Sequence, residues 1–326
     1  RARRGNPGGP LTARLAGLAR FLGEGRRHGW PALAITTLFA LVLAVHSRYA
    51  DYGFKSSVWD VGVWEQQLWY ILETGQPYTS AMFCHGFGDH FSPFLYLLAP
   101  LYGLWPSSLG LMLLGVAALS ASLPVFYRLA GELTGDRVPW PWLWGALLAY
   151  ACYLPLRRLV IFPFHPEAFT PVLFFGMCLC WRRRRPGWAA LLLVLLASIR
   201  ETNLVFVFST GLFLAVFERR PRLGGLLMAG AAGLLAFLLL AVIPWYQGTH
   251  PHYVYFDRYD WLGTTPEEIA GNILLHPLRV LAFMLQPAKL KFLSDLLLPL
   301  GFLPLLAPRF LLPALPPLVL HLASNY

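Results

Sequence analysis

The chain has 326 residues, of which 57% are hydrophobic and only 13% are charged, and its formal net charge is +10. A soluble domain carries about 25% charged residues, so this chain has too little polar surface to face water on all sides. Its long apolar stretches predict an all-α polytopic membrane protein, because helices satisfy their own backbone hydrogen bonds in lipid. The four cysteines show neither metal-ligand nor disulfide spacing, and we interpret them as small apolar residues.

Apolar segments predict about nine transmembrane helices in one domain, residues 30–326, which follows a basic cytoplasmic tail, residues 1–29. The first span, residues 30–46, lacks a convincing cleavage site and is expected to remain as a signal anchor. Residues 94–105 are apolar but short, and we expect them to lie only partly in the membrane. The other spans are expected at residues 107–130, 140–156, 168–181, 188–199, 204–217, 223–245, 292–307 and 310–322.

The charges are unevenly divided between the two sides of this predicted bundle. With a cytoplasmic N-terminus, most arginines fall inside, including the run 182–185, as the positive-inside rule requires. All histidines except His28, and most acidic residues, then fall on the outer side or outer membrane face. The net charge is therefore a topology signal, which argues against nucleic acid as a partner. We expect a multi-pass protein of the plasma (inner) membrane whose active face is extracytoplasmic.

Polar residues gather in a first outer loop, residues 48–93, and in a second, residues 247–291. Within the first, residues 58–73 suit an interfacial helix on which Asp60 and Gln67 share one face. A carboxylate there can accept a proton from a hydroxyl or amine nucleophile. It can equally complement the dipole of a helix N-terminus. Asp60 is thus a candidate general base, and both interpretations remain open.

The first outer loop ends in a turn that contains His85, Asp89 and His90, directly before Pro93. Imidazole and backbone N–H groups favour a metal or a phosphate group. The structural alternative is a capped turn in which Asp89 or Ser92 is the N-cap.

A second His and acid pair, His165 and Glu167, opens a later span and is either a helix-start signal or part of a polar cavity. A divalent metal is a possible cofactor, although the spacing matches no standard ligand pattern. Its candidate ligands are His85, Asp89, His90, His165 and Glu167.

Arg200 and Glu201 lie between two short apolar runs, where two charges must pair with each other or line a wet cavity. Arg258 and Lys289 add positive charge on the outer side and are candidates for binding an anionic ligand. We interpret the tyrosines of the second outer loop as part of the interfacial aromatic belt rather than as a surface for stacking a sugar.

Together these motifs resemble the uncharacterised membrane family called domain of unknown function 2079. The family typically shows an Asp-x-Gly…Gln-x-x-Trp-like segment, matched here by Asp60-Val-Gly62 and Gln67-Leu-Trp69. It also shows Asp-His-Phe-Ser-Pro and Phe-His-Pro-Glu segments, which correspond to residues 89–93 and 164–167. Its Lys-Glu pair is replaced by Arg200-Glu201. The resemblance covers nearly the whole chain from the first span onward.

That family is similar in layout to the GT-C glycosyltransferases, whose first outer loop contains juxtamembrane helices and an acidic catalytic residue. The resemblance implies a sugar transferase that uses a polyprenyl-phosphate donor, with Asp60 as the catalytic base. Membrane lipid and the lipid-linked sugar are the expected partners. The implied substrate-binding residues are Gln67, His85, Asp89, His90, His165, Glu167, Arg200, Glu201, Arg258 and Lys289. Many GT-C enzymes continue beyond the position where this chain stops, which leaves open that an acceptor-binding part is missing.

Two other classes of function remain as alternatives. A transporter or lipid flippase would use the break at Arg200 and Glu201 as a site near the membrane midplane. Against it, the sequence shows no internal repeat and its polar residues gather at one face. A non-catalytic lipid-binding membrane protein would use the same loops for partner binding alone.

Overall fold

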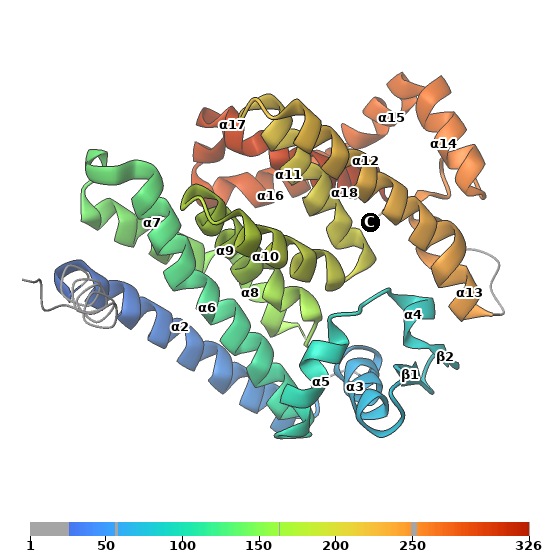
Figure 1. Ribbon diagram of the computed structural model, residues 1–326, viewed down its shortest axis with the longest axis horizontal. Coiled ribbons are helices and arrows are strands. Elements are labelled where there is room, and N and C mark those ends of the chain that lie inside the picture. The colour runs from blue at the N-terminus through green and yellow to red at the C-terminus, as the bar shows by residue number, and fades with distance from the viewer. Residues whose placement is uncertain (1–25, 56–57, 163, 249–252, 326) are drawn as a thin grey trace, which may run out of the picture.

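The computed structural model describes residues 26–55, 58–162, 164–248 and 253–325, so most of the predicted basic tail lies outside the described residues. The described chain is almost entirely helical, and its one short antiparallel pair joins β1 (Tyr78–Thr79) to β2 (Cys84–His85) (Figure 1). Three helical stretches are long and apolar enough to cross a membrane, and three further apolar helices are shorter. These findings agree with a helical membrane protein, while the number of nine spans stays a prediction.

The first two long helices lie side by side. α2 (Arg26–Tyr52) and α6 (Ser108–Thr134) have 27 residues each, about 40 Å of helix, which exceeds a hydrocarbon core of about 30 Å. They pack through a buried apolar cluster that includes Phe39 and Leu43 from α2 and Leu119 from α6 (Figure 1). Both predicted spans, 30–46 and 107–130, are therefore confirmed as helices.

Several other predicted spans are short or broken. Residues 140–156 divide into α7 (Trp140–Cys152) and α8 (Leu154–Ile161), because Pro155 cannot donate to the preceding turn. α9 (Thr170–Arg182), α10 (Pro186–Ser198) and α11 (Leu204–Val216) have 13 residues each, about 20 Å of helix. None of these helices crosses a hydrocarbon core unaided at that length.

The third long stretch runs through α12 (Pro221–Phe237), a π-turn η5 (Leu238–Val242) and α13 (Ile243–Gln247). The predicted span 292–307 is broken, because prolines recur every few residues and remove backbone donors. It contains the end of α16 (Pro287–Leu297), then η7 (Leu298–Leu300) and η8 (Leu303–Leu306). The predicted span 310–322 lies within one apolar helical stretch, Pro308–Ala323, which consists of α17 (Pro308–Leu311), η9 (Leu312–Ala314) and α18 (Leu315–Ala323).

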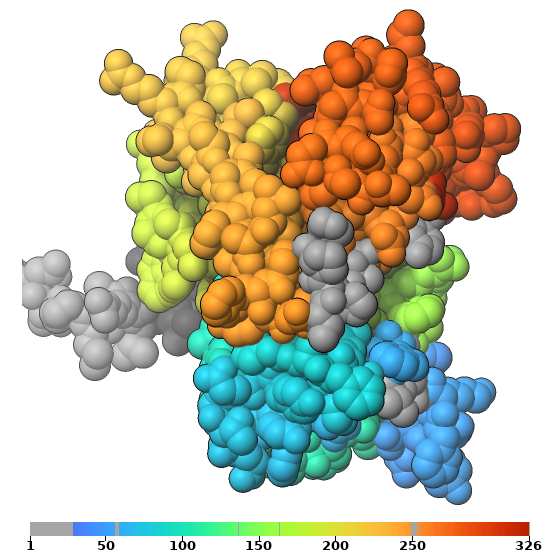
Figure 2. Space-filling view, turned by 90° about the vertical axis from the view of Figure 1, so that its right-hand side faces the viewer, coloured from blue at the N-terminus to red at the C-terminus, as the bar shows by residue number. Residues whose placement is uncertain are grey.

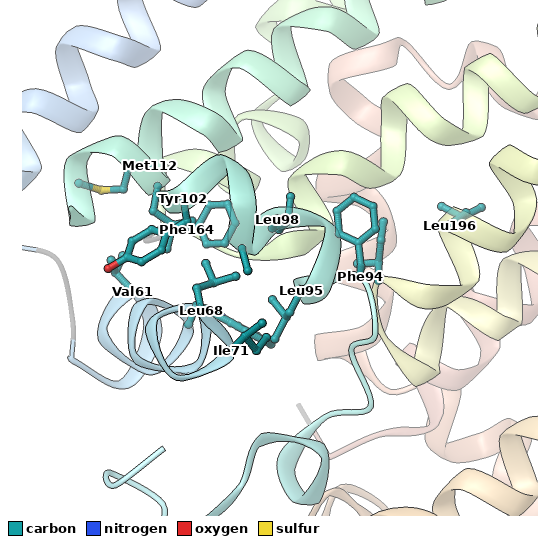
Figure 3. Packing of buried hydrophobic residues seen from close by; sticks show 14 residues of the cluster. Val61, Leu68, Ile71, Phe94, Leu95, Leu98, Tyr102, Met112, Phe164 and Leu196 are labelled. Carbon is teal, nitrogen blue, oxygen red and sulfur yellow. The ribbon is translucent and has the colours of Figure 1, made fainter. Parts of the chain in front are cut away.

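The helix predicted at residues 58–73 of the first outer loop is present. A π-turn, η1 (Val58–Gly62), leads into α3 (Val63–Thr74), followed by α4 (Gly86–Asp89) and α5 (Leu95–Gly103). The buried face of α3, with Leu68 and Ile71, packs on Leu95 and Leu98 of α5 (Figure 3). This apolar contact holds α3 in place beside the charged motifs.

The second outer loop touches the first through Tyr255, whose hydroxyl donates to Asp89 Oδ1. It contains η6 (Val254–Tyr259), α14 (Pro266–Leu275) and α15 (Pro277–Met284). The first-loop segment lies directly below the end of the α12–α13 stretch (Figure 2). There α4 approaches α13 so closely that a Cβ atom at Gly88 would meet the Tyr246 carbonyl carbon at 2.9 Å. The two outer loops therefore meet at one end of the bundle.

Candidate functional site

Glu201 is the most deeply buried charged residue of the outer end. It lies in η4 (Glu201–Asn203), the turn between α10 and α11, and its side chain is fully buried. Its Oε1 accepts a hydrogen bond from the Tyr253 hydroxyl at 2.6 Å and lies 3.0 Å from His90 Nδ1. Its Oε2 accepts a bond from the Phe91 backbone N–H at 3.0 Å. Glu201 therefore joins both outer loops to the α10–α11 turn.

Arg200 links this carboxylate to a second one. Its Nη1 donates to Glu167 Oε1 at 2.6 Å, and its Nε lies 3.7 Å from Glu201 Oε1. Its Nη2 also contacts His90 Nε2. Its Nε also donates to His90 Nδ1 at 3.2 Å, so both ring nitrogens of His90 lie against charged side chains. The pairing expected for Arg200 and Glu201 is present, and it extends to a third charged residue.

The pKa of Glu167 shows that this pairing outweighs burial. Burial alone would raise the pKa of the Glu167 carboxyl, but the adjacent Arg200 guanidinium holds it below its usual range. His165, two residues earlier in the chain, lowers the pKa of Glu167 in the same direction. Glu167 is therefore ionised near neutral pH.

Asp60 is a partly exposed carboxylate that lies close to His165. Its Oδ1 lies 3.6 Å from His165 Nε2, and the two side chains are 26% and 29% exposed. Exposure falls from this pair, through Glu167 and Arg200, to Glu201, which has none. Asp60 is thus the carboxylate in this series that a solvent-side hydroxyl group reaches most easily.

A tyrosine of the second outer loop covers His90. The Tyr255 ring stacks on the imidazole with centroids 4.7 Å apart, and its hydroxyl donates to Asp89 Oδ1 at 2.9 Å. The Arg258 guanidinium carbon lies 4.6 Å from the centroid of the same ring. Burial raises the pKa of Tyr255, and the Asp89 carboxylate raises it further, so the hydroxyl remains a donor. Asp89 and Arg258 thereby join the site.

The structure places two predicted site residues elsewhere. His85 is the N-cap of α4, where its Nδ1 accepts from Phe87 N–H at 3.2 Å, and its Nε2 lies 3.0 Å from Gln76 Oε1. The alternative in which Asp89 or Ser92 is the N-cap of the helix after this turn was wrong, because the N-cap of α5 is Phe94 and Asp89 accepts a hydrogen bond from Tyr255. Lys289 is buried beside the end of α18, with its Nζ 2.5 Å from the Ser324 carbonyl oxygen.

The candidate metal ligands are not arranged around a common point. In the part of the chain that the structure describes, no group of three His, Cys, Asp or Glu side chains is placed to hold a metal ion. Both ring nitrogens of His90 have protein partners, Glu201 and Arg200, and His85 is turned towards α4.

Tyr253 and Tyr255 are functional candidates that sequence reasoning missed. Their assignment to the interfacial belt was wrong, because Tyr253 is only 6% exposed and both hydroxyls bond to acidic residues of the site. Burial raises the pKa of Tyr253, and the neighbouring Glu201 raises it further. A tyrosine of the interfacial belt cannot be distinguished in sequence from one that binds a buried acid. The only signal was that Asp89 and Glu201, if buried, need hydrogen-bond donors.

Gln67 is buried in an unusual way. It is 1% exposed, and neither its Oε1 nor its Nε2 has a hydrogen-bond partner among the described residues. Its amide lies against Gly86, where a Cβ atom would collide with it. A buried amide without partners costs about 1–3 kcal/mol.

Replacing Gln67 with methionine, which has a similar shape, is therefore expected to raise the free energy of unfolding by about 1 kcal/mol. The matched control is Gln66→Met, because Gln66 bonds to Ser80 through both ends of its amide and should lose a little stability. Thermal unfolding in detergent measures both variants. A lower melting temperature for Gln67→Met than for Gln66→Met would contradict this account of the buried amide.

Comparison with known proteins gives one match. A family model described as "Predicted membrane protein (DUF2079)" matches residues 51–326, a range that contains all the site residues described above. No curated protein matches the chain. No solved structure matches it either.

Proposed function

The chain belongs to DUF2079, a family of predicted membrane proteins, and on that premise we propose that it is a membrane glycosyltransferase of GT-C type. It would transfer a sugar from a polyprenyl-phosphate donor to an acceptor on the extracytoplasmic side of the plasma membrane. The N-terminus would then be cytoplasmic, with the two outer loops forming the active face. The observation that carries this proposal is the partly exposed Asp60–His165 pair beside a buried charge network.

In this proposal Asp60 is the general base. Its carboxylate takes the proton of the acceptor hydroxyl as that oxygen attacks the anomeric carbon of the donor sugar. The new glycosidic bond forms while the bond from the anomeric carbon to the phosphate oxygen breaks. The lipid phosphate leaves with the electron pair, and the configuration at the anomeric carbon is inverted. His165, at 3.6 Å from Asp60, orients the carboxylate.

The surrounding charges suggest different roles from those that the motifs imply. Arg200 is shared between Glu167 and Glu201, so most of its charge is already compensated, and we assign it to positioning. Arg258 lies on the outer face of Tyr255, is exposed, and is the better candidate for the leaving phosphate. His90, Glu201 and Tyr253 hold the two outer loops against each other beneath this site.

An apolar groove near the network suits the lipid part of such a donor. It has a volume of about 450 Å³. One of its lining residues is Leu204, the residue directly after η4, which contains Glu201. Its walls come from α11, α12, η9 and α18, and they are almost entirely aliphatic. Lining residues include Leu204, Phe208, Leu235, Leu312, Leu315 and Val319. A hydrocarbon chain in this groove would leave its phosphate at the outer end, near the charged residues.

The test is sugar release in proteoliposomes that contain either polyprenyl-phosphate glucose or polyprenyl-phosphate mannose. Asp60→Asn should lower the rate at which free polyprenyl phosphate appears by about 10²–10⁴-fold, the usual contribution of a general base. The matched control is Glu73→Gln, since Glu73 is an exposed acid of the same helix and far along it from the site. Equal rates for Asp60→Asn and the wild type would reject the base role. Solute flux without any donor turnover would instead support a transporter.

A further inference from the structure

Two turns lie at the end of the bundle opposite α3 and α4, and each places two arginines directly before a helix that begins with proline (Figure 1). In the first, Arg184 and Arg185 follow Arg183 and directly precede Pro186, the first residue of α10. In the second, Arg219 and Arg220 follow Phe217 and Glu218 and directly precede Pro221, the first residue of α12. In each turn the first of the two arginines has a left-handed backbone, with φ of 55° at Arg184 and 54° at Arg219.

Arginine is an unfavourable residue at both of these positions. Its Cβ crowds the following carbonyl oxygen when φ is positive, whereas glycine adopts the same backbone without strain. Elsewhere glycine adopts this backbone at Gly75, which ends α3 with φ of 76°, and phenylalanine adopts it at Phe54, Phe83 and Phe302. The two turns therefore keep arginine at positions where glycine would relieve backbone strain.

The two turns form one positively charged surface. The Arg220 guanidinium carbon lies 5.1 Å from the centroid of the Trp181 ring, so the second turn touches the end of α9. Glu132 is occupied by Arg182 and Arg183, with a shortest distance of 2.5 Å to Arg183 Nη2. Among the described residues no ion pair or side-chain hydrogen bond engages the exposed arginines that remain. These are Arg184, Arg185, Arg219 and Arg222.

Large apolar side chains begin immediately beyond this surface. Trp188 follows the first turn and is 61% exposed, and Leu226 follows the second and is 73% exposed. Exposed tryptophan and leucine next to a ring of arginines mark the boundary between hydrocarbon and headgroups. A phospholipid at this boundary would place its acyl chains on the helices and its phosphate at the turns.

We propose that the two arginine turns form a binding surface for anionic phospholipid headgroups. The support for this proposal is the group of exposed arginines without partners among the described residues, next to the exposed side chains of Trp188 and Leu226. Each arginine near an anionic membrane surface adds favourable electrostatic energy. This inference is independent of the proposed sugar transfer and of Asp60.

The test uses the full chain in nanodiscs of phosphatidylcholine, either alone or with phosphatidylglycerol added. The wild type should unfold at a higher temperature in discs that contain phosphatidylglycerol. The double variant Arg184→Gly/Arg219→Gly should lose most of that increase. In phosphatidylcholine alone it should melt at the same temperature as the wild type or higher, since glycine relieves the backbone strain.

The control variant Arg184→Lys/Arg219→Lys keeps the charge and should keep the increase. Soluble glycerophosphate, added to discs of phosphatidylcholine, distinguishes a lipid surface from a site for small anions; an equal increase would overturn the lipid assignment. Full retention of the phosphatidylglycerol effect by the glycine variant would also overturn it. If the double variant fails to assemble, native mass spectrometry measures how much phosphatidylglycerol stays bound to the single variant Arg219→Gly. As much bound phosphatidylglycerol as in the wild type would overturn the proposal.

Discussion

Replacing Glu201 with alanine is expected to lower the free energy of unfolding by about 3–5 kcal/mol, the usual result of removing one partner from a buried ion pair. The substitution leaves the Arg200 guanidinium with one carboxylate instead of two. It also leaves the Tyr253 hydroxyl and the Phe91 backbone N–H without their acceptor. Each buried donor then loses its hydrogen bond without regaining water.

Thermal unfolding in detergent, followed by tryptophan fluorescence, measures this loss. The matched control is Asp295→Ala, which removes an acid 2.6 Å from Lys291 in an exposed pair within α16. Exposed pairs of this kind contribute about 0.5 kcal/mol or less, so the control should melt like the wild type. Glu201→Gln should lie between the two, because the amide keeps one acceptor oxygen and loses the charge. Melting of Glu201→Ala at the wild-type temperature would contradict the central place of this residue.

Replacing Gly224 with valine is expected to lower the free energy of unfolding by about 3 kcal/mol, the upper part of the range for an overpacked core. Gly224 of α12 faces Gly211 of α11, and the two backbones approach closely. A Cβ atom at Gly224 would lie 2.8 Å from the Ala215 backbone nitrogen and would collide with the Gly211 carbonyl oxygen. Backbone atoms cannot rotate away, so the two helices must separate.

The neighbouring glycine provides the control. A Cβ atom at Gly225 would meet no other atom within 4 Å, although the residue lies in the same helix. Gly225→Ala should therefore keep the stability or raise it by up to about 1 kcal/mol, the difference in helix propensity between the two residues. Gly224→Ala should fall between the wild type and Gly224→Val. The same melting experiment decides, and equal temperatures for Gly224→Val and Gly225→Ala would mean that α11 and α12 do not pack at these positions.

Much of the site follows from sequence because its charged residues are expensive in a membrane protein. Arg200 and Glu201 interrupt an apolar region, and Glu167 opens a helix, so each had to find a partner or a cavity. The structure joins these charged residues in one network, and the Asp60–His165 pair acts on it through the electrostatic effect of His165 on Glu167. The first-loop helix was also predictable, because its apolar residues recur at helical spacing.

The positions of two histidines and two tyrosines could not be predicted from the sequence. His85 and His90 are only five positions apart, yet one caps α4 and the other lies between Glu201 and Tyr255. Nothing in their spacing reveals which way the chain turns at Gly86. Tyr253 and Tyr255 come from a loop more than 150 residues later, and their hydroxyls reach the site only because α13 carries the second outer loop back over α4.

The sequence by itself determined that this is a membrane protein, and it predicted that the polar residues gather on one side of the membrane. Hydropathy and charge bias are sums over residues, so these properties do not depend on how the helices pack. Only the tertiary structure decided which acids, bases and tyrosines share a site. Glu201 and His90 are 111 positions apart, and their contact depends on the packing angles of several helices and on the turn that each proline imposes. Such distances are set by packing across the whole bundle, and no local pattern contains them.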